Sequence, residues 1–423
     1  MVSVTAARRL SPVAAFAVPA SIVALALYAS ATPSPLYAVY QQRWHFSTPM
    51  LTVIYATYPA GVLVALVLMG TLSDQLGRRP VLRWSLVGLL IAMGLFVFAD
   101  SVAWLLAARA VQGLATGAAL GAAGAALIDL HPRGDAAHAG LVNGVASTVG
   151  IASGALVSAA LVDAAPAPRV IPFVVVCALI VLALVAVWAI PESVVVVDRP
   201  RLRPTRPSIP EPTREAFMLA ALGVLASWSI GGLFLSLAPV VSDALLKTHS
   251  VLAGGATVAA LTVPAGIAQI LGHRRSNRTL ATVGALTLSA GMLGIVAGDL
   301  VGSAVLFFAA AIVTGVGFGM AFMGALRNLS GAIPPARRGE VMSAFYLVAY
   351  AAISLPAVAA GIALPHAGIH DTLLGFGVAV AALGLFVARA AMRIGRDPAA
   401  RLAGAATPVG GVQCVSGDVA RGC

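Results

Sequence analysis

A short polar stretch between two long apolar runs holds the residues whose types and spacing are best suited to chemistry. In the stretch GTLSDQLGRR, Gly70, Asp74, Gly77, Arg78 and Arg79 follow the spacing G-x-x-x-D-x-x-G-R-R. The second glycine permits a tight turn, and the carboxylate can meet the positive N-terminal end of a helix. The arginines can pair with an acid or with lipid phosphates. The pattern predicts a charged turn that docks against another helix.

Apolar runs surround this turn and make up most of the chain. Of the 423 residues, 60% are apolar and 10% are charged, which excludes an ordinary soluble domain. A helix needs about 20 apolar residues to cross a bilayer, and the runs are too long and too uniform for barrel strands. The sequence predicts an all-α integral membrane protein with twelve transmembrane helices, near residues 12–33, 49–71, 81–99, 102–128, 139–162, 170–190, 217–241, 250–271, 280–298, 300–326, 341–364 and 371–391.

The placement of arginine and lysine predicts the orientation. With the N-terminus inside, 22 of the 26 basic residues fall in inner segments, only Arg43, Arg169 and Lys247 lie outside, and Arg109 lies within the fourth run. Such a bias marks the cytoplasmic side of a membrane protein. It accounts for the net charge of +11 without nucleic-acid binding. We expect both termini in the cytoplasm and a bacterial-type inner membrane.

The first apolar run has an alternative reading as a cleavable signal peptide. Arg8 and Arg9 precede it, and it ends in Ala29-Ser30-Ala31. It is longer than a typical signal core, so we interpret it as the first span.

Cysteine and glycine patterns predict no cofactor. Cys177, Cys414 and Cys423 have no paired spacing and form no metal-ligand pattern with the seven histidines. We expect no disulfide framework and no metal site. The chain also lacks a glycine-rich loop followed by lysine, which disfavours ATP-driven pumping.

A polar interval separates two halves that resemble each other. Residues 191–216 hold six prolines and five arginines, which is typical of a solvated linker between six-helix bundles at 1–190 and 217–397. GLATG at Gly113–Gly117 answers to GVGFG at Gly315–Gly319, 202 positions later. This repeat favours a duplicated unit. The tail at 398–423 is rich in Gly and Ala and is predicted to be disordered.

The charged turn and the twelve-span layout together resemble the major facilitator superfamily over nearly the whole chain. The resemblance implies that Asp74 docks near the start of the eleventh helix, around Val341. It also implies that Arg78 pairs with Asp129 at the inner end of the fourth helix, so that the turn and Asp129 act as a conformational gate. One departure is Gln75, where the family usually has a basic residue. A plain positive-inside turn is the alternative reading.

Arg109, in RAVQG, is similar to a second motif of the family, in which a buried arginine lies near the proton pathway. At that depth an arginine needs water, a carbonyl or an acid as a partner. Alternatively, its side chain reaches the outer surface, because Asp100 begins this helix only nine residues earlier. None of the fifteen acids lies near the centre of a span. Arg109 and Asp129 are therefore the candidates for proton coupling, and uncoupled diffusion stays open.

The fifth span carries glycines that look like a degraded antiporter motif of the family. They are Gly144, Gly150 and Gly154, with Ala155 in place of the expected proline. Ordinary close packing of helices explains the same spacing equally well.

Polar and aromatic side chains inside the spans are candidates for a substrate cavity, since the resemblance implies that these helices line one. The alternative interpretation of each aromatic candidate is that it lies at the bilayer interface, where tyrosine and tryptophan are common. The candidates are Tyr28, Tyr55, Tyr58, Gln112, Asn143, Trp228, Gln269, Asn328, Tyr346 and Tyr350.

The resemblance implies a secondary transporter that moves a small solute by alternating access, and we favour proton-coupled efflux of drug-like or metabolite compounds. The alternatives are a proton symporter or a facilitative uniporter for a sugar or another metabolite. An integral-membrane enzyme would have to use His131 and His138 with Asp129 and Asp135, which fit a polar turn better. A sensor would more plausibly carry a large soluble domain. We expect a monomer that contacts solute, protons and membrane lipids, and no nucleic acid.

Overall fold

The computed structural model describes residues 10–69, 72–194, 208–246, 251–333 and 337–394, and all regular structure in these ranges is helical. Gly70, residues 195–207 of the predicted linker and the predicted tail lie outside the described residues. The helices are α1 (Pro12–Ala31), α2 (Tyr37–Trp44), α3 (Thr48–Met69), α4 (Leu72–Leu76), α5 (Arg78–Val97), α6 (Val102–Asp129), α7 (Ala136–Ala164), α8 (Ile171–Ala189), the 3₁₀ turn η1 (Glu211–Thr213), α9 (Arg214–Leu246), α10 (Val251–Gly272), α11 (Asn277–Val301), α12 (Ala304–Ala332) and α13 (Arg338–Ile394).

Within the described residues, eleven helices are long and apolar enough to cross a membrane. The last, α13, has 57 residues and a non-helical backbone at Gly368, with φ 78° and ψ 175°. At a rise of 1.5 Å per residue it measures roughly 86 Å, more than twice what one crossing needs. Gly368 therefore divides α13 into two spans, which match the expected eleventh and twelfth. The predicted twelve-span all-α architecture is confirmed.

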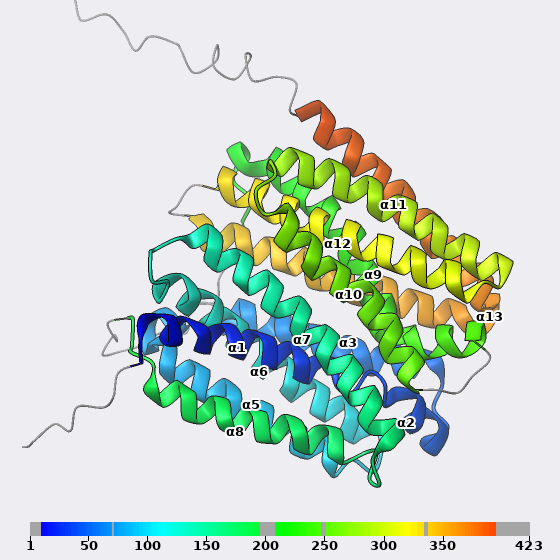
Figure 1. Ribbon diagram of the computed structural model, residues 1–423, viewed down its shortest axis with the longest axis horizontal. Helices are drawn as coiled ribbons and strands as arrows, with labels where there is room; N and C mark the ends of the chain where they lie inside the picture. Colours follow the sequence, from blue (N-terminus) through cyan, green and yellow to red (C-terminus); the bar gives the residue numbers. More distant parts are fainter. Residues whose placement is uncertain (1–9, 70–71, 195–207, 247–250, 334–336, 395–423) are drawn as a thin grey trace, which may run out of the picture.

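Two groups of helices lie side by side in Figure 1, with α1 to α8 in one and α9 to α13 in the other. We call the end of the molecule that carries α4 the inner end, and the end that carries α2 and Gly368 the outer end. Contacts between the two groups are made chiefly by α7 with α10 and by α3 with α13. These two helix pairs therefore form the junction of the halves.

The glycine repeat found in the sequence makes the same contact in both halves. A Cβ on Gly113 or Gly117 of α6 would collide with the carbonyls of Tyr58 and Val62 on α3. In the second half, Gly315 and Gly319 of α12 meet the carbonyls of Leu261 and Ala265 on α10 in the same way. Small residues let the backbones of membrane helices approach closely.

The glycines of the fifth span also serve packing within one half. A Cβ on Gly150 or Gly154 of α7 would collide with the backbone carbonyls of Ala24 and Tyr28 on α1. Ordinary helix contact therefore accounts for these two glycines. Gly144 instead faces the other half, where the Oε1 atom of Gln269 would lie 2.7 Å from an added Cβ.

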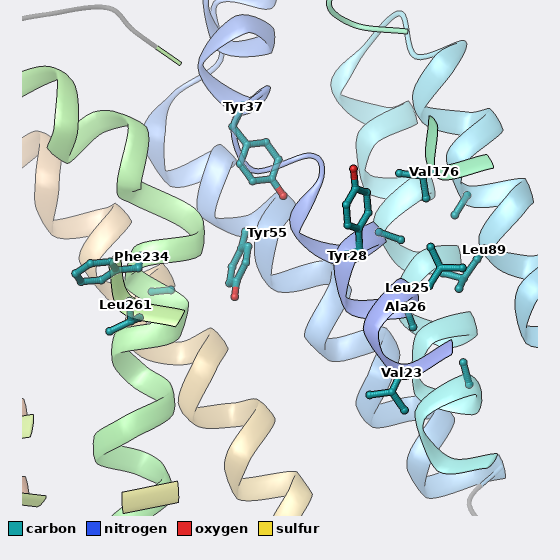
Figure 2. Close-up of a cluster of buried hydrophobic side chains, with 14 of the residues drawn as sticks. Val23, Leu25, Ala26, Tyr28, Tyr37, Tyr55, Leu89, Val176, Phe234 and Leu261 are labelled. Atoms are coloured by element: carbon teal, nitrogen blue, oxygen red, sulfur yellow. The ribbon is translucent and has the colours of Figure 1, made fainter. Parts of the chain in front are cut away.

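The largest hydrophobic cluster continues from the first half into the second. It includes Tyr37 and Tyr55 of the first half together with Phe234 and Leu261 of the second. Figure 2 shows Tyr55 on the side of the first half that faces Phe234 and Leu261, whereas Tyr28 lies toward Leu89 and Val176 of its own half. The junction is thus joined by apolar contact at the level of Tyr55.

Candidate functional site

The charged turn is organised around the buried side chain of Arg78, which begins α5. Its Nε donates to Oδ2 of Asp129 at 3.0 Å, and its Nη1 donates to Oγ of Ser73 at 2.7 Å and to Oδ1 of Asp74. Asp129 also accepts from Oγ of Ser193 at 3.0 Å. The pairing of Arg78 with Asp129 is the one that the resemblance implies, and it ties the ends of α4, α5 and α6 together.

Glu192, which sequence reasoning missed, completes this network from the end of α8. Its two carboxylate oxygens accept the backbone N–H groups of Arg78 at 2.7 Å and Arg79 at 3.0 Å. A carboxylate at these first N–H groups satisfies free donors and stabilises the positive end of the helix dipole. The sequence signal is a lone acid directly after Pro191, where the sixth apolar run ends.

Gly77 is required by the same contact. Its φ of 94° is unfavourable for other residues, and an added Cβ would lie 2.7 Å from Oε2 of Glu192. Arg79 is also held in place, since its Nη2 donates to the carbonyl of Trp188 at 2.8 Å.

Helix α4 and the inner ends of α5, α6 and α8 therefore form one polar unit. We call it the inner network, and its members are Ser73, Asp74, Arg78, Asp129, Glu192 and Ser193.

Of the two carboxylates that pair with Arg78, Asp74 is more open to solvent than Asp129, whose side chain is 30% exposed. The side chain of Asp74 is 57% exposed and pairs with Arg78, four residues on. Val341, the expected docking region, is fully buried within a separate cluster with Phe345 and Leu329. The expected docking of Asp74 near the start of α13 is therefore not seen in this conformation, and it stays a prediction.

At the outer end the halves are in close contact. A Cβ on Gly255 of α10 would lie 2.7 Å from Cβ of Ala159 and 2.9 Å from the carbonyl of Ala155, both on α7. The backbone N–H of Leu252 donates to Oδ2 of Asp163 at 3.2 Å. In the second junction pair, a Cβ on Gly361 of α13 would collide with the side chain of Thr52 on α3. Both junction pairs are thus closed at this end.

Arg109 lies at the centre of the first half and is fully buried, so its side chain does not reach the outer surface. Its Nε donates to Oη of Tyr37 at 2.7 Å and its Nη2 donates to the same hydroxyl. Its Nη1 donates to the carbonyl of Ser30 at 2.9 Å and to Oε1 of Gln112 at 2.7 Å. Every hydrogen bond that the described residues give Arg109 goes to a neutral acceptor.

Aromatic rings supply the rest of the surroundings of Arg109. Its Cζ lies 5.2, 5.6 and 5.7 Å from the ring centroids of Tyr37, Tyr58 and Phe96, within the range of cation–π attraction. The sequence analysis did not assign this role to Tyr37. Short helix α2 folds Tyr37 back over the bundle, and no sequence period indicates such a contact.

Asp129, the second coupling candidate, lies far from Arg109. The two residues are twenty positions apart on α6, or roughly 30 Å along a straight helix. The structure therefore places them in different sites: Arg109 in the core of the first half, and Asp129 in the inner network. Their roles in proton coupling stay predictions.

Several of the cavity candidates meet where the halves join. The indole of Trp228 on α9 packs edge-on against Tyr350 of α13, with ring centroids 5.4 Å apart, and against Phe322 at 5.3 Å. Tyr58 of α3 packs against Tyr350, with Trp228 and Tyr346 beside it. We call Tyr58, Trp228, Phe322, Tyr346 and Tyr350 the junction cluster. In this conformation Tyr58 and Tyr350 are buried, whereas Trp228, Phe322 and Tyr346 remain partly exposed.

The other candidates are distributed around this cluster. Gln269 is buried on the seam between α7 and α10, and Asn143 and Asn328 are half-buried. Gln112 is held within the first half, because its Nε2 donates to the carbonyl of Ala29 at 2.8 Å while its Oε1 accepts from Arg109. Tyr28 is buried in the first half.

The histidines of the alternative enzyme reading form part of a surface turn. Nε2 of His131 and Nδ1 of His138 are 2.9 Å apart, and Asp135 accepts from the backbone N–H groups of His138 and Ala137 at the start of α7. The bond from the His138 N–H is the main cause that lowers the pKa of Asp135. These side chains stabilise a helix end.

Comparison with known proteins identifies the family. The model of the Major Facilitator Superfamily matches residues 20–357. The structure of the proton:xylose symporter XylE bound to 6-bromo-6-deoxy-D-glucose is similar with a TM-score of 0.70 and 14% identity, covering 90% of this chain and 95% of that one. The partially occluded inward open conformation of the xylose transporter XylE from E. coli has the same TM-score and identity, with 91% and 100% coverage. No curated protein matches this chain. The family match covers most of the sequence, and the chain belongs to the major facilitator superfamily of membrane transporters.

Proposed function

We propose that this protein is a secondary transporter of the inner membrane that exports drug-like or metabolite compounds in exchange for protons, with both termini in the cytoplasm. The observation that carries the alternating-access part is the junction of two helical halves through two helix pairs. At the outer end, Gly255 and Gly361 bring both pairs into close contact, and toward the inner end α7 and α10 meet again at Gly144 and Gln269. Two halves that meet along such a seam can rock about it, which is how a carrier opens to one side at a time.

The surroundings of Arg109 support export of solutes other than strong bases. The Cζ of its guanidinium lies 5.6 Å from the ring centroid of Tyr58, a member of the junction cluster, and its hydrogen-bond partners are neutral. A buried arginine of this kind is a functional candidate in a membrane protein. We infer that Arg109 keeps a positive electrostatic potential beside the solute pathway, and that this potential affects the binding of protons and polar solutes there.

A facilitative uniporter is the second candidate. It is favoured by one observation on the helices that build the junction cluster: α3 and α12 carry no acidic residue, α9 carries acids only near its ends, and α13 carries Glu340 at its start and Asp371 beside the break at Gly368. A carrier that needs no proton has no requirement for a titratable carboxylate in its cavity.

Solute flux into proteoliposomes tests these proposals. Dyes, antibiotics, sugars and amino acids are presented to purified protein, with and without a pH gradient. Exchange predicts that the gradient raises uptake into inverted vesicles for a compound that the protein recognises. Equal fluxes with and without the gradient would favour the uniporter, and no flux above empty vesicles for any compound would contradict transport. A variant with His131 and His138 changed to Ala serves as the control for the enzyme reading and should transport normally.

A further inference from the structure

We propose that the junction cluster selects an uncharged aromatic solute that carries a hydrogen-bond acceptor, and that it rejects permanent cations. The assignment of this ligand as the transported solute rests on the proposed function. The preference itself follows from three features of the junction: its rings, its unpaired donors and the charge behind it.

The rings come from helices of both halves. Tyr58 belongs to α3, Trp228 to α9, Phe322 to α12, and Tyr346 and Tyr350 to α13. Their edge-on and tilted contacts, at 5.3 to 5.4 Å between centroids around Trp228, leave ring faces that a planar ligand can replace once the halves separate. A ligand between them would touch both halves, which is what couples binding to their relative motion.

Three buried donors at the junction have no partner among the described residues. These are the indole Nε1 of Trp228 and the hydroxyls of Tyr55 and Tyr58, which lie one helical turn apart on α3. An indole nitrogen only donates, and a buried donor without an acceptor is costly. A solute that offers a carbonyl, an ether oxygen or a ring nitrogen satisfies such a donor, whereas a plain hydrocarbon does not.

The charge behind the cluster distinguishes solutes by sign. The Cζ of Arg109 lies 5.6 Å from the ring centroid of Tyr58, so one face of the cluster is backed by a positive charge. A permanent cation would be desolvated next to this charge without a carboxylate to offset it. An anion finds no direct partner, since Arg109 is fully buried and donates to Tyr37, Ser30 and Gln112.

Four probes of similar size test the proposal: quinoline, naphthalene, N-methylquinolinium and 2-naphthoate. Their binding to the purified full chain in lipid nanodiscs is measured by equilibrium dialysis at pH 7.5, and binding to empty nanodiscs is subtracted. We expect quinoline to bind about tenfold more tightly than naphthalene, as one hydrogen bond allows, and both to bind more tightly than the two charged probes.

Variants assign the preference to the junction. Trp228→Phe keeps an aromatic ring and removes the N–H, so the advantage of quinoline over naphthalene should fall to about twofold or less. Tyr55→Phe should reduce it in the same direction. Trp84→Phe is the matched control, because Trp84 is 74% exposed on the outside of α5, and it should leave all four affinities unchanged.

Binding of N-methylquinolinium or 2-naphthoate as tight as that of quinoline would overturn the proposal. So would a quinoline advantage that survives in both Trp228→Phe and Tyr55→Phe, or no binding of any probe above empty nanodiscs. Because dialysis measures binding without transport, an absence of flux in proteoliposomes would contradict the proposed function and not the preference. Flux of cations in place of neutral aromatics would contradict the preference and leave the transport function standing.

Discussion

Two tyrosines on the same short helix offer a matched test of how the buried charge is held. Tyr37 and Tyr40 are both buried on α2, but the hydroxyl of Tyr37 accepts from Nε and Nη2 of Arg109, whereas that of Tyr40 has no partner among the described residues. Tyr37→Phe therefore removes the one oxygen that accepts two hydrogen bonds from a guanidinium that has no access to water. Tyr40→Phe removes the same atom from the same helix and breaks no hydrogen bond.

The expected magnitudes differ clearly. A hydrogen bond to a charged group contributes about 1.5 to 3 kcal/mol, so the loss of two should lower the free energy of unfolding by about 3 kcal/mol or more. Removing the unpaired hydroxyl of Tyr40 should change it by less than about 1 kcal/mol, and in the stabilising direction where burial of that oxygen is costly. We expect a difference of about 3 kcal/mol between the variants.

Unfolding by SDS in mixed micelles, followed by circular dichroism, measures both variants against the parent protein. A double-mutant cycle adds Arg109→Leu, in whose background Tyr37→Phe should cost little. Equal destabilisation by Tyr37→Phe and Tyr40→Phe, or a coupling energy near zero in the cycle, would refute the role assigned to Tyr37.

Three further predictions concern the two ends of the molecule. Glu192→Gln should lower the stability of the protein by about 1 to 2 kcal/mol in the same assay, because two backbone N–H groups lose an ionised acceptor; an unchanged unfolding midpoint would contradict the capping role. Gly255→Val should shift the protein away from the state with a closed outer end by about 1 to 3 kcal/mol of overpacking, while Gly94→Val, which meets open space, should not. Spin-label distances across the outer end measure this shift, and identical distributions for the two variants would refute it. Asp74→Asn should slow exchange between states more than it weakens solute binding, so equal transport rates for variant and parent would exclude Asp74 from the gate.

The helical architecture could be predicted from the sequence, because a lipid bilayer permits few kinds of backbone structure. In hydrocarbon every backbone polar group must be satisfied within the helix, so apolar length predicts spans directly. The prediction did not extend to α2, which has only eight residues, three of them the polar Gln41, Gln42 and Arg43. At the outer turn of α13 the predicted spans 341–364 and 371–391 enclose Gly368, where the helix is broken.

Side-chain partners were predicted less well, for a reason that the inner network illustrates. The contact of Arg78 with Asp129 was available only through the family resemblance, and Glu192 was missed although it is the acid that caps α5. Arg78 is 51 positions from Asp129 and 114 positions from Glu192, its partners on other membrane helices. The periodicity of one helix carries no information on how its neighbouring helices are rotated. Gln112 shows the same limit: its place in a span made it a cavity candidate, but both ends of its amide are engaged within the first half.

The two ends of the molecule are built from different chemistry, and this bears on how the halves can move. The inner network joins α4, α5, α6 and α8, which all belong to the first half, so a rocking motion of that half leaves its hydrogen bonds intact. The outer contacts cross the junction, but they consist of small residues and one exposed hydrogen bond from Leu252 to Asp163. Separating such surfaces strands no buried charge, and exposed polar contacts of this kind contribute little. Of the two carboxylates that pair with Arg78, Asp74 is the more exposed, so we expect closure of the inner end to change its surroundings most. The prediction for Asp74→Asn follows from this arrangement: the inner network moves as one unit with the first half, and Asp74 is its side chain best placed to gain or lose a contact with the second half.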